Sequence, residues 1–189
     1  MTTSDSTDLA AIKKEFLIAS RNRNRPLDFF PHLKDVLLYI SMNDCAVVSA
    51  KDGHYYIGTS GLSSCAGIAV YDPQHHVGGV AHISFNPEVT GFITKVSGFQ
   101  FSRFSDYASR LISAADKVGG DSGFTHFYDF YAFNIEGGSR TKLQNNQLTE
   151  IVEDTIQRLR TEKKILNFYY RNERAFLLNT KTGDILPNL

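Results

Sequence analysis

Two side chains in this sequence have the chemistry of a nucleophile and its base. Cys65 and His82 stand at the ends of the segment Cys-Ala-Gly-Ile-Ala-Val-Tyr-Asp-Pro-Gln-His-His-Val-Gly-Gly-Val-Ala-His, whose apolar arms and central turn predict a β-hairpin. A hairpin can bring a thiol and an imidazole from opposite arms onto one face of a sheet. An imidazole beside a thiol favours the thiolate, which is the form that attacks a carbonyl carbon.

The register of the hairpin decides whether these two side chains share a face. If the turn is centred between Gln74 and His75, Cys65 lies opposite Ser84. His82 is then the diagonal neighbour of Cys65 on the same face, about 7–8 Å away between backbone positions. A slip of one residue would put the two side chains on opposite faces.

Further residues could complete a catalytic site around Cys65. Thr59 ends the preceding predicted strand, and its hydroxyl, or a nearby carbonyl, could fix the tautomer of His82. Small residues fill the bend that follows, so backbone N–H groups near Ser63 and Ser64 could stabilise an oxyanion. Turnover requires the thiol and the imidazole to meet in an accessible cleft. Residue types and spacing alone favour a simpler interpretation, a buried cysteine beside a hydrogen-bonded histidine.

The bulk composition limits the classes of partner. Twenty basic residues balance twenty acidic ones in a chain of 189 residues, so no strong field predicts nucleic-acid binding. The longest apolar runs are far shorter than a membrane span. Residues 1–7 lack the basic and apolar regions of a secretory signal peptide. We therefore expect a protein that is cytoplasmic in the producing cell, with no nucleic-acid partner and no membrane span.

The cysteines and histidines argue against a metal site. The chain has two cysteines, Cys45 and Cys65, which we expect to be reduced thiols. It contains neither Cys-x-x-Cys nor His-x-x-x-His, and these spacings are typical of zinc sites. His75 and His76 are adjacent in the predicted turn, which is a poor spacing for joint ligation, and we expect both to be solvated. The sequence therefore predicts no metal ion and no cofactor.

Apolar periodicity predicts a helical extension over residues 1–43 and a β-rich domain over residues 44–189. Helices are expected at residues 8–20, 32–40, 103–118 and 146–161. Strands are expected at residues 45–50, 54–59, 66–71, 78–85, 126–134, 165–170, 175–179 and 184–186. An Asp-Gly turn between the first two strands predicts that they form a hairpin. The pattern predicts an α+β fold, with mixed, mostly antiparallel, sandwich-like sheets flanked by helices.

The segment Gly58-Thr-Ser-Gly-Leu-Ser-Ser-Cys-Ala-Gly-Ile-Ala-Val-Tyr-Asp-Pro, followed by Val-Gly-Gly-Val-Ala-His, resembles the CheD family, the chemoreceptor glutamine deamidases of bacterial chemotaxis. Thr59, Cys65 and His82 fall at the intervals of that family, and the resemblance extends over about residues 45–187. It implies a cysteine-histidine core shared with the cytotoxic necrotizing factors and related deamidase toxins. The chain departs from the family in residues 1–43, in the segment Ile-Ser-Phe-Asn-Pro after His82 and in the loop 139–145.

The resemblance implies a protein-glutamine deamidase that needs no cofactor. Cys65 would attack a glutamine side-chain amide and form a thioester, His82 would protonate the departing ammonia and then activate water, and Thr59 would orient His82. The substrate would be a chemoreceptor, or a host protein if the chain is a toxin-like effector exported without a signal peptide. Two alternatives stay open. The chain could be a non-catalytic signalling module that binds a partner protein, or a transglutaminase that uses the same thioester.

Overall fold

The protein forms two β-sheets and two long helices over the residues that this computed structural model describes, which are 11, 12, 14, 16, 37–53, 55–85, 100–120, 126–162 and 164–187. The larger sheet has the order β2-β5-β4-β6-β7, with β2 at Asp44–Ser49, β4 at Ala66–Asp72, β5 at Val77–Ile83, β6 at Tyr128–Phe133 and β7 at Ile165–Arg171. The smaller sheet has the order β1-β3-β8-β9, with β1 at Leu37–Tyr39, β3 at Tyr56–Ser60, β8 at Ala175–Asn179 and β9 at Ile185–Pro187. One strand pair in each sheet is parallel, β6–β7 and β1–β3, and the other pairs are antiparallel.

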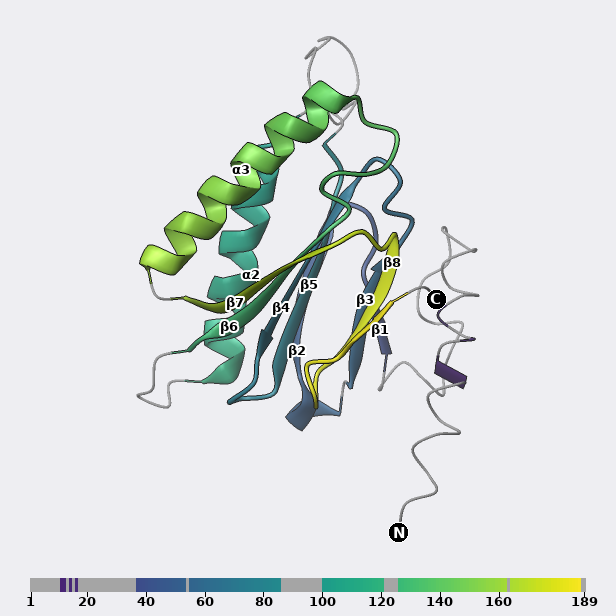
Figure 1. Ribbon diagram of the computed structural model, residues 1–189. Coiled ribbons are helices and arrows are strands. Elements are labelled where there is room, and N and C mark those ends of the chain that lie inside the picture. Colours follow the sequence, from purple (N-terminus) through teal and green to yellow (C-terminus); the bar gives the residue numbers. More distant parts are fainter. Residues whose placement is uncertain are drawn as a thin grey trace, which may run out of the picture.

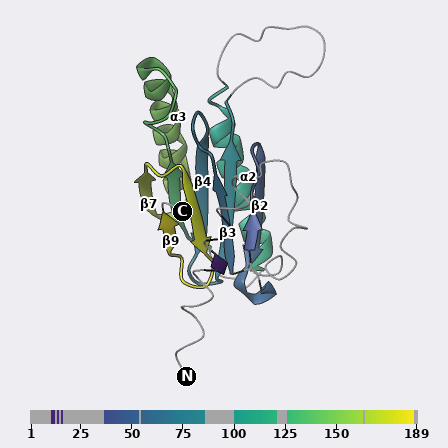
Figure 2. The ribbon, with the colours of Figure 1, turned by 90° about the vertical axis from the view of Figure 1, so that its right-hand side faces the viewer.

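These elements form three layers, which confirms the predicted α+β fold with sandwich-like sheets. The helices α2 (Arg103–Gly119) and α3 (Lys142–Thr161) cover one face of the larger sheet (Figure 1). The smaller sheet covers the other face and lies in front of it in Figure 2. Strand alternation explains both contacts, because Ile68 and Val70 of β4 pack with the helices while Ala69 and Tyr71 pack with the smaller sheet.

Local sequence signals explain where the two helices begin and end. In α2, the buried positions Phe104, Ala108, Leu111 and Ala115 recur at helical spacing, and the helix ends at Gly119, one residue beyond the predicted end. Helix α3 begins at Lys142, earlier than expected. The reason is a capping box in which the side chain of Thr141 accepts from the N–H of Gln144, and the Gln144 side chain accepts from the N–H of Thr141.

The predicted register of the β4–β5 hairpin is confirmed. Gly67 pairs with His82, and Ala66 pairs with Ile83. Cys65 directly precedes β4, so it lies on the same face as Gly67 and His82. This is the face that packs against the smaller sheet.

The predicted hairpin between residues 45–50 and 54–59 is wrong. The strands exist as β2 and β3, but β2 pairs with β5 in the larger sheet, and β3 pairs with β1 and β8 in the smaller one. The 3₁₀ turn η2 (Ala50–Asp52) and the left-handed Gly53 carry the chain from one sheet to the other. An Asp-Gly turn signals a change of direction, but it does not determine which sheet the second strand joins.

The N-terminal extension is described only in part. Residues 11, 12, 14 and 16 are helical, and Ile12 and Phe16 are buried near Leu177 of β8. The helix expected at residues 32–40 is wrong over its described part, because Leu37–Tyr39 forms strand β1 and pairs with β3. The domain boundary at residue 44 stays a prediction, and residues 86–99 lie outside the described residues.

His75 also differs from its predicted state. It is 8% exposed rather than solvated, because its ring packs against the carboxylate of Asp72. His76 is exposed, as expected, and its Nδ1 lies 3.1 Å from the hydroxyl of Tyr71.

Candidate active site

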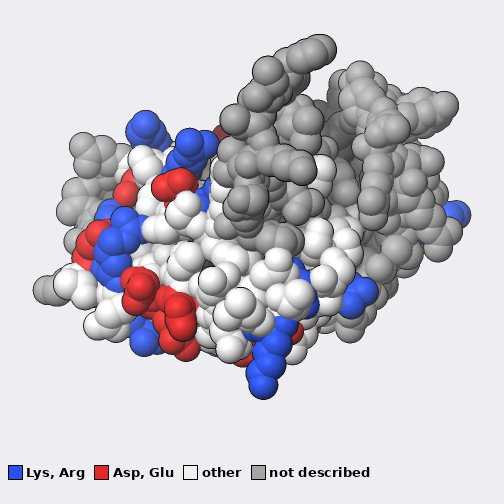
Figure 3. Space-filling view, turned by 90° about the horizontal axis from the view of Figure 1, so that it is seen from above, with Lys and Arg blue, Asp and Glu red and all other residues white. Residues whose placement is uncertain are grey.

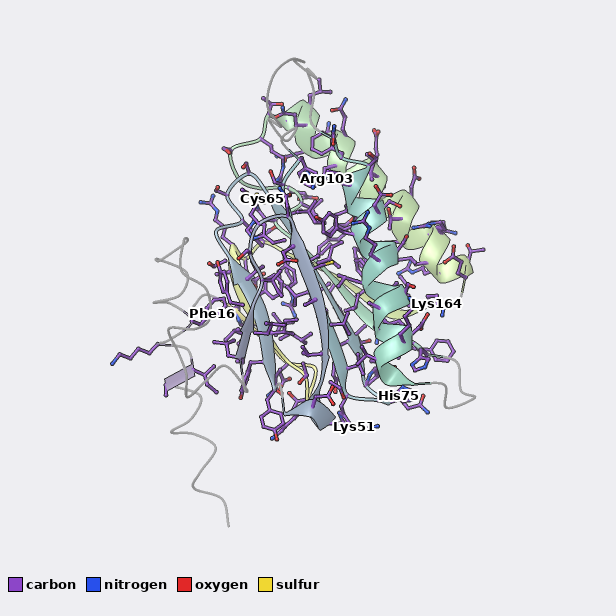
Figure 4. All side chains as sticks on the ribbon, turned by 180° about the vertical axis from the view of Figure 1, so that it is seen from behind. Phe16, Lys51, Cys65, His75, Arg103 and Lys164 are labelled. Carbon is purple, nitrogen blue, oxygen red and sulfur yellow. The ribbon has the colours of Figure 1, made fainter. Side chains whose placement is uncertain are left out.

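Cys65 lies at the end of a bend that joins the two sheets. The bend, residues 61–65, leaves β3 in the smaller sheet and enters β4 in the larger one. Figure 4 shows Cys65 at one end of the larger sheet. The N–H of Leu62 donates to the carbonyl of Arg174 at 3.1 Å, and the N–H of Ser63 donates to the carbonyl of Gly61 at 2.8 Å. The N–H of Ser63 is therefore engaged within the bend, and Ser64 is the remaining candidate of the two predicted oxyanion donors.

The side chain of Thr59 lies between the backbone of Ile40 and the ring of His82. Its hydroxyl donates to the carbonyl of Ile40 at 2.7 Å, and its oxygen lies 2.8 Å from Nδ1 of His82. A hydroxyl has one hydrogen to donate. Because that hydrogen goes to Ile40, Nδ1 must carry the hydrogen of the second bond, and a neutral His82 keeps its lone pair on Nε2.

Three strands position this pair. Thr59 belongs to β3, His82 belongs to β5, and Ile40 follows β1, whose parallel pairing with β3 brings its carbonyl to Thr59. Both side chains are buried, with Thr59 0% and His82 4% exposed. Gly67 pairs with His82 and is two residues from Cys65 on this face, and a Cβ atom on it would come within 3.0 Å of the side chains of Leu62 and Phe176.

The thiol and the imidazole are buried and do not line an open cleft, so the accessible cleft expected from the sequence is absent from the described residues in this state. Cys65 and His82 are each 4% exposed, and Cys65 packs in the apolar cluster between the two sheets with Leu62 and Phe133. Main-chain carbonyls and a guanidinium group lie on the other side of the bend. The surroundings of Cys65 are therefore enclosed but partly polar.

A buried arginine from a distant loop holds the backbone of the bend. Arg140 is 6% exposed, and its guanidinium donates to carbonyl oxygens at Ser64 (2.9 Å), Cys65 (3.2 Å), Ile135 (2.9 Å) and Asn134. Its Nε donates to Oδ1 of Asn145 at 2.9 Å. All these partners are neutral. A fixed positive charge therefore lies beside the backbone of the candidate nucleophile.

The charges of Arg140 and Cys65 interact. Burial lowers the pKa of Arg140, and attraction to the Cys65 thiolate opposes this by raising it. The attraction is mutual, so the guanidinium opposes the effect of burial, which disfavours the thiolate form of Cys65.

The loop of residues 134–140 fixes the direction of the peptide groups around Cys65. Four successive carbonyls of the bend accept from this loop: Leu62 from Asn134, Ser63 from the N–H of Ser139 (3.0 Å), Ser64 from Arg140 (2.9 Å), and Cys65 from Asn134 (2.9 Å) and Arg140 (3.2 Å). The described peptides are trans, so the C=O and N–H of each unit point in opposite directions. The N–H groups of Ser64 and Cys65 therefore point away from the loop.

Asn134 and two glycines shape this loop. Asn134 has a φ of 54°, and its Nδ2 donates to the carbonyls of Leu62 and Cys65. At Gly137 a Cβ atom would lie 2.5 Å from Oδ1 of Asn134, and at Gly138, with a φ of 83°, it would lie 1.7 Å from the carbonyl oxygen of Ser63. The glycine pair is therefore required for the loop to approach the bend.

Sequence analysis missed Asn134 and Arg140. It noted residues 139–145 only as a departure from the family pattern. The available signal for Arg140 was a lone arginine directly after Gly-Gly-Ser. Its partners are backbone carbonyls, which every residue has, so no residue type in the sequence identifies them. Among the described residues, the cluster that could hold a metal ion lies elsewhere, at Asp72, His75 and His126.

The surface at this end of the molecule has mixed charge. Figure 3 looks onto the end of the sheets at which Cys65 lies, and its described part carries acidic and basic side chains interspersed. This agrees with the balanced composition. Within the described residues, no helix is both long enough and apolar enough to cross a membrane.

Comparison with known proteins gives a partial likeness. No protein-family model matches the sequence. The chain is 38% identical over 64 residues to the probable chemoreceptor glutamine deamidase CheD of Archaeoglobus fulgidus, a match that spans 33% of this chain and 37% of that protein. The chain thus matches little more than a third of that relative's length. The match supports a distant relationship to CheD, and it does not extend to the deamidase toxins.

Proposed function

We propose that this chain is a cysteine-dependent protein-glutamine deamidase, with Cys65 as nucleophile, His82 as acid and base, and Thr59 as the residue that positions His82. The observation that carries the proposal is the hydrogen bond between Thr59 and His82. It assigns the ring hydrogen to Nδ1, so Nε2 is the nitrogen that can exchange a proton with a thiol or a leaving group. The partial likeness to a probable chemoreceptor glutamine deamidase gives the substrate class.

The first half of the reaction forms a thioester. The Cys65 thiolate attacks the carbon of a glutamine side-chain amide, a C–S bond forms, and the carbonyl electron pair moves onto oxygen. The N–H groups of Ser64 and Cys65, which point away from the Arg140 loop, are the candidate donors to that oxyanion. His82 as imidazolium gives its Nε2 proton to the amide nitrogen, the C–N bond breaks, and ammonia leaves.

The second half releases glutamate. Water attacks the thioester carbon while Nε2 of His82, now neutral, takes one of its protons. The C–S bond breaks, the carboxyl group of glutamate is released, and the thiolate and imidazolium pair is restored. Arg140 takes no part in bond making and acts as a positioning residue, because its charge favours the thiolate and its donors orient the bend.

The enclosed position of Cys65 restricts what can react. With 4% of its surface exposed, Cys65 can be reached only by a slender group such as a glutamine side chain and not by a folded surface. We expect the substrate glutamine to lie on an exposed, protruding part of a receptor, where its long side chain can extend to the thiol.

A deamidation assay tests the proposal. The purified chain is incubated with the cytoplasmic domain of a chemoreceptor from the same organism, and peptide mass spectrometry follows conversion of individual glutamines to glutamates. We expect conversion with wild type and with Cys45→Ser, and none with Cys65→Ser or His82→Gln. Conversion that persists in Cys65→Ser would overturn the mechanism.

A second arm separates the alternatives. Addition of a primary amine to the same reaction would label the substrate if the thioester is resolved by transglutamination instead of by water. Binding of the receptor domain without any change of mass, in wild type and in Cys65→Ser alike, would identify a non-catalytic module.

A further inference from the structure

Three residues from separate parts of the sequence form a buried cluster at the other end of β4. Asp72 is the last residue of β4, His75 lies in the turn to β5, and His126 lies just before β6. We call these residues the Asp72 cluster. They are 0%, 8% and 8% exposed, and each offers one ligand atom, with all three atoms within 4.8 Å of one another. Figure 4 shows His75 at the end of the sheet opposite to Cys65.

The two oxygens of Asp72 have different partners. Oδ1 accepts from the N–H groups of Gln74 and His75, at 2.9 and 3.1 Å, and thereby forms the turn. Oδ2 lies 2.7 Å from Nδ1 of His75 and 2.7 Å from Nδ1 of His126. One carboxylate oxygen and two imidazole nitrogens therefore converge in a site shielded from water.

The hydrogen on the His126 ring is assigned by its other partner. Nε2 of His126 lies 3.1 Å from the carbonyl oxygen of Gly120, and a carbonyl can only accept a hydrogen bond. Nε2 therefore carries a hydrogen. A neutral ring then directs the lone pair of Nδ1 at the Asp72 oxygen, which is repulsive unless a cation lies between them or the ring carries a second proton.

The backbone at the end of α2 is shaped to the edge of this ring. At Gly119 a Cβ atom would lie 2.6 Å from Cε1 and 3.0 Å from Nδ1 of His126. Any larger residue would push the helix end away from His126. The contact from Nε2 to a backbone carbonyl is the outer-shell arrangement that orients a metal-binding histidine and fixes its tautomer.

We propose that Asp72 Oδ2, His75 Nδ1 and His126 Nδ1 bind one Zn²⁺ ion. Two imidazoles and one carboxylate are a ligand set that zinc uses, with water in the fourth position. Zinc at its usual bond lengths sets neighbouring ligand atoms about 3.3 Å apart. The 2.7 Å contacts therefore have to open by a fraction of an ångström, which rotation of the side chains supplies.

The ion would act on the stability of the fold, with a water molecule completing the three protein ligands. It would tie the β4–β5 turn to the start of β6 and, through Gly120, to the end of α2. It lies at the opposite end of β4 from Cys65, so it takes no part in the proposed deamidation. No metal site was predicted from the sequence, because short ligand spacings are absent and this cluster combines residues that are distant in the chain.

Zinc binding is tested on the full chain after treatment with a chelator. Zn²⁺ alone is added, binding is followed by calorimetry, and the retained metal is measured after gel filtration. We expect one ion per chain and a rise in melting temperature with zinc concentration, because the ion binds the folded state. Substitution of Co²⁺ should give the visible absorption of a tetrahedral site with nitrogen and oxygen ligands.

Adjacent histidines provide a matched pair of variants. His75→Asn should weaken zinc binding by at least about 100-fold, since loss of a direct ligand exceeds the effect of an outer-shell change. His76→Asn should bind as wild type does, because His76 lies outside the cluster and asparagine tolerates its φ of 55°. Asp72→Asn keeps the turn-forming Oδ1 but replaces Oδ2 with an amide, so it should fold and lose the ion.

Two results would overturn the proposal. Wild type that retains no zinc, with an unchanged melting temperature at saturating Zn²⁺, would identify the cluster as a hydrogen-bonded ion pair. Equal zinc binding by wild type, His75→Asn and Asp72→Asn would assign the ion to another place. If circular dichroism shows that a variant is unfolded, the cobalt spectrum and the zinc stoichiometry of wild type and His76→Asn still decide whether the Asp72 cluster binds zinc.

Discussion

The hydroxyl oxygen of Thr59 lies 2.8 Å from Nδ1 of His82 and gives its own hydrogen to the carbonyl of Ile40. This relationship crosses the interface between the two sheets, because Thr59 belongs to the smaller sheet and His82 to the larger one. The packing of the sheets therefore determines the tautomer of the imidazole. Residues that act by holding Thr59 in place contribute to the proposed chemistry without approaching a substrate.

Replacing Thr59 by valine removes the hydroxyl and keeps the shape. We expect deamidation to fall by about 10²-fold, at the lower end of what a correctly oriented acid and base contributes. The free energy of unfolding should also fall, by about 1–3 kcal/mol, because the buried Ile40 carbonyl loses its partner. Assays of deamidation and chemical denaturation measure the two effects.

Thr59→Ser is the control, because serine restores the hydroxyl. Nitrogen NMR of the His82 ring adds a measurement that a purely structural role would not change. At a pH at which the ring is neutral, wild type and Thr59→Ser should carry the ring hydrogen on Nδ1, and Thr59→Val should shift toward the other tautomer. An unchanged tautomer in the valine variant would contradict the assigned role.

The two cysteines should react at different rates with iodoacetamide near neutral pH. Burial is the largest cause that raises the pKa of Cys45, with the charge of Asp44 adding to it, so its thiolate forms only at more alkaline pH than usual. Cys65 has Arg140 beside it, which favours the thiolate. We expect Cys65 to be alkylated first although it is the more buried thiol, as read by peptide mass spectrometry.

The pH dependence provides the check on this prediction. Alkylation of Cys45 should increase as pH rises through its raised pKa. Faster alkylation of Cys45 at every pH would contradict an activated Cys65.

The parts of the fold that the sequence predicts are those set by neighbours in the chain. The β4–β5 register follows from a short turn and alternating apolar residues, and α2 follows from helical spacing that ends at Gly119-Gly120. The pairing of β2 with β5 could not be predicted, because the sheet that a strand joins depends on contacts distant in sequence. The short run Leu37–Tyr39 fits a helix or a strand equally well by periodicity.

The same distinction applies to the candidate site. Thr59 and His82 were expected to interact because each lies near the end of a predictable strand, and the structure brings them together. Arg140 was missed because a charged residue in a polar loop is normally solvated, whereas this one is buried by binding backbone carbonyls. Its role depends on tertiary contacts that apolar patterning does not encode.

Arg140 should contribute to both stability and thiol reactivity. Arg140→Met leaves several buried carbonyls without their donor, and we expect the free energy of unfolding to fall by about 2–4 kcal/mol. Alkylation of Cys65 should slow as well. Arg140→Lys keeps the charge but not the planar set of donors, so it should recover part of the reactivity and little of the stability.

Arg158→Met on the exposed face of α3 is the matched control for this prediction. Its guanidinium donates to the hydroxyls of Ser105 and Ser109 at the surface, so its loss should change stability by no more than about 0.5 kcal/mol. Equal losses in Arg140→Met and Arg158→Met, measured by denaturant titration, would remove the argument for a structural role of the buried guanidinium.

A comparison of Gly138→Ala with Gly120→Ala distinguishes the effect of backbone strain from the effect of the loop's close approach to the bend at Cys65. Both have a positive φ, 83° and 82°, which L side chains rarely adopt, and Gly120 combines it with a ψ of 160°, so alanine adds backbone strain of about 1–3 kcal/mol at either position. At Gly120 a Cβ atom meets nothing within 4 Å, whereas at Gly138 it would overlap the carbonyl oxygen of Ser63 at 1.7 Å. Gly138→Ala should therefore destabilise the protein more than Gly120→Ala does. It should also slow Cys65 alkylation. The carbonyl of Ser63 would have to move away from the N–H of Ser139, and the bend that precedes Cys65 would then lose its fixed direction. Equal melting temperatures and equal alkylation rates for the two variants would mean that the bend is not held by this loop.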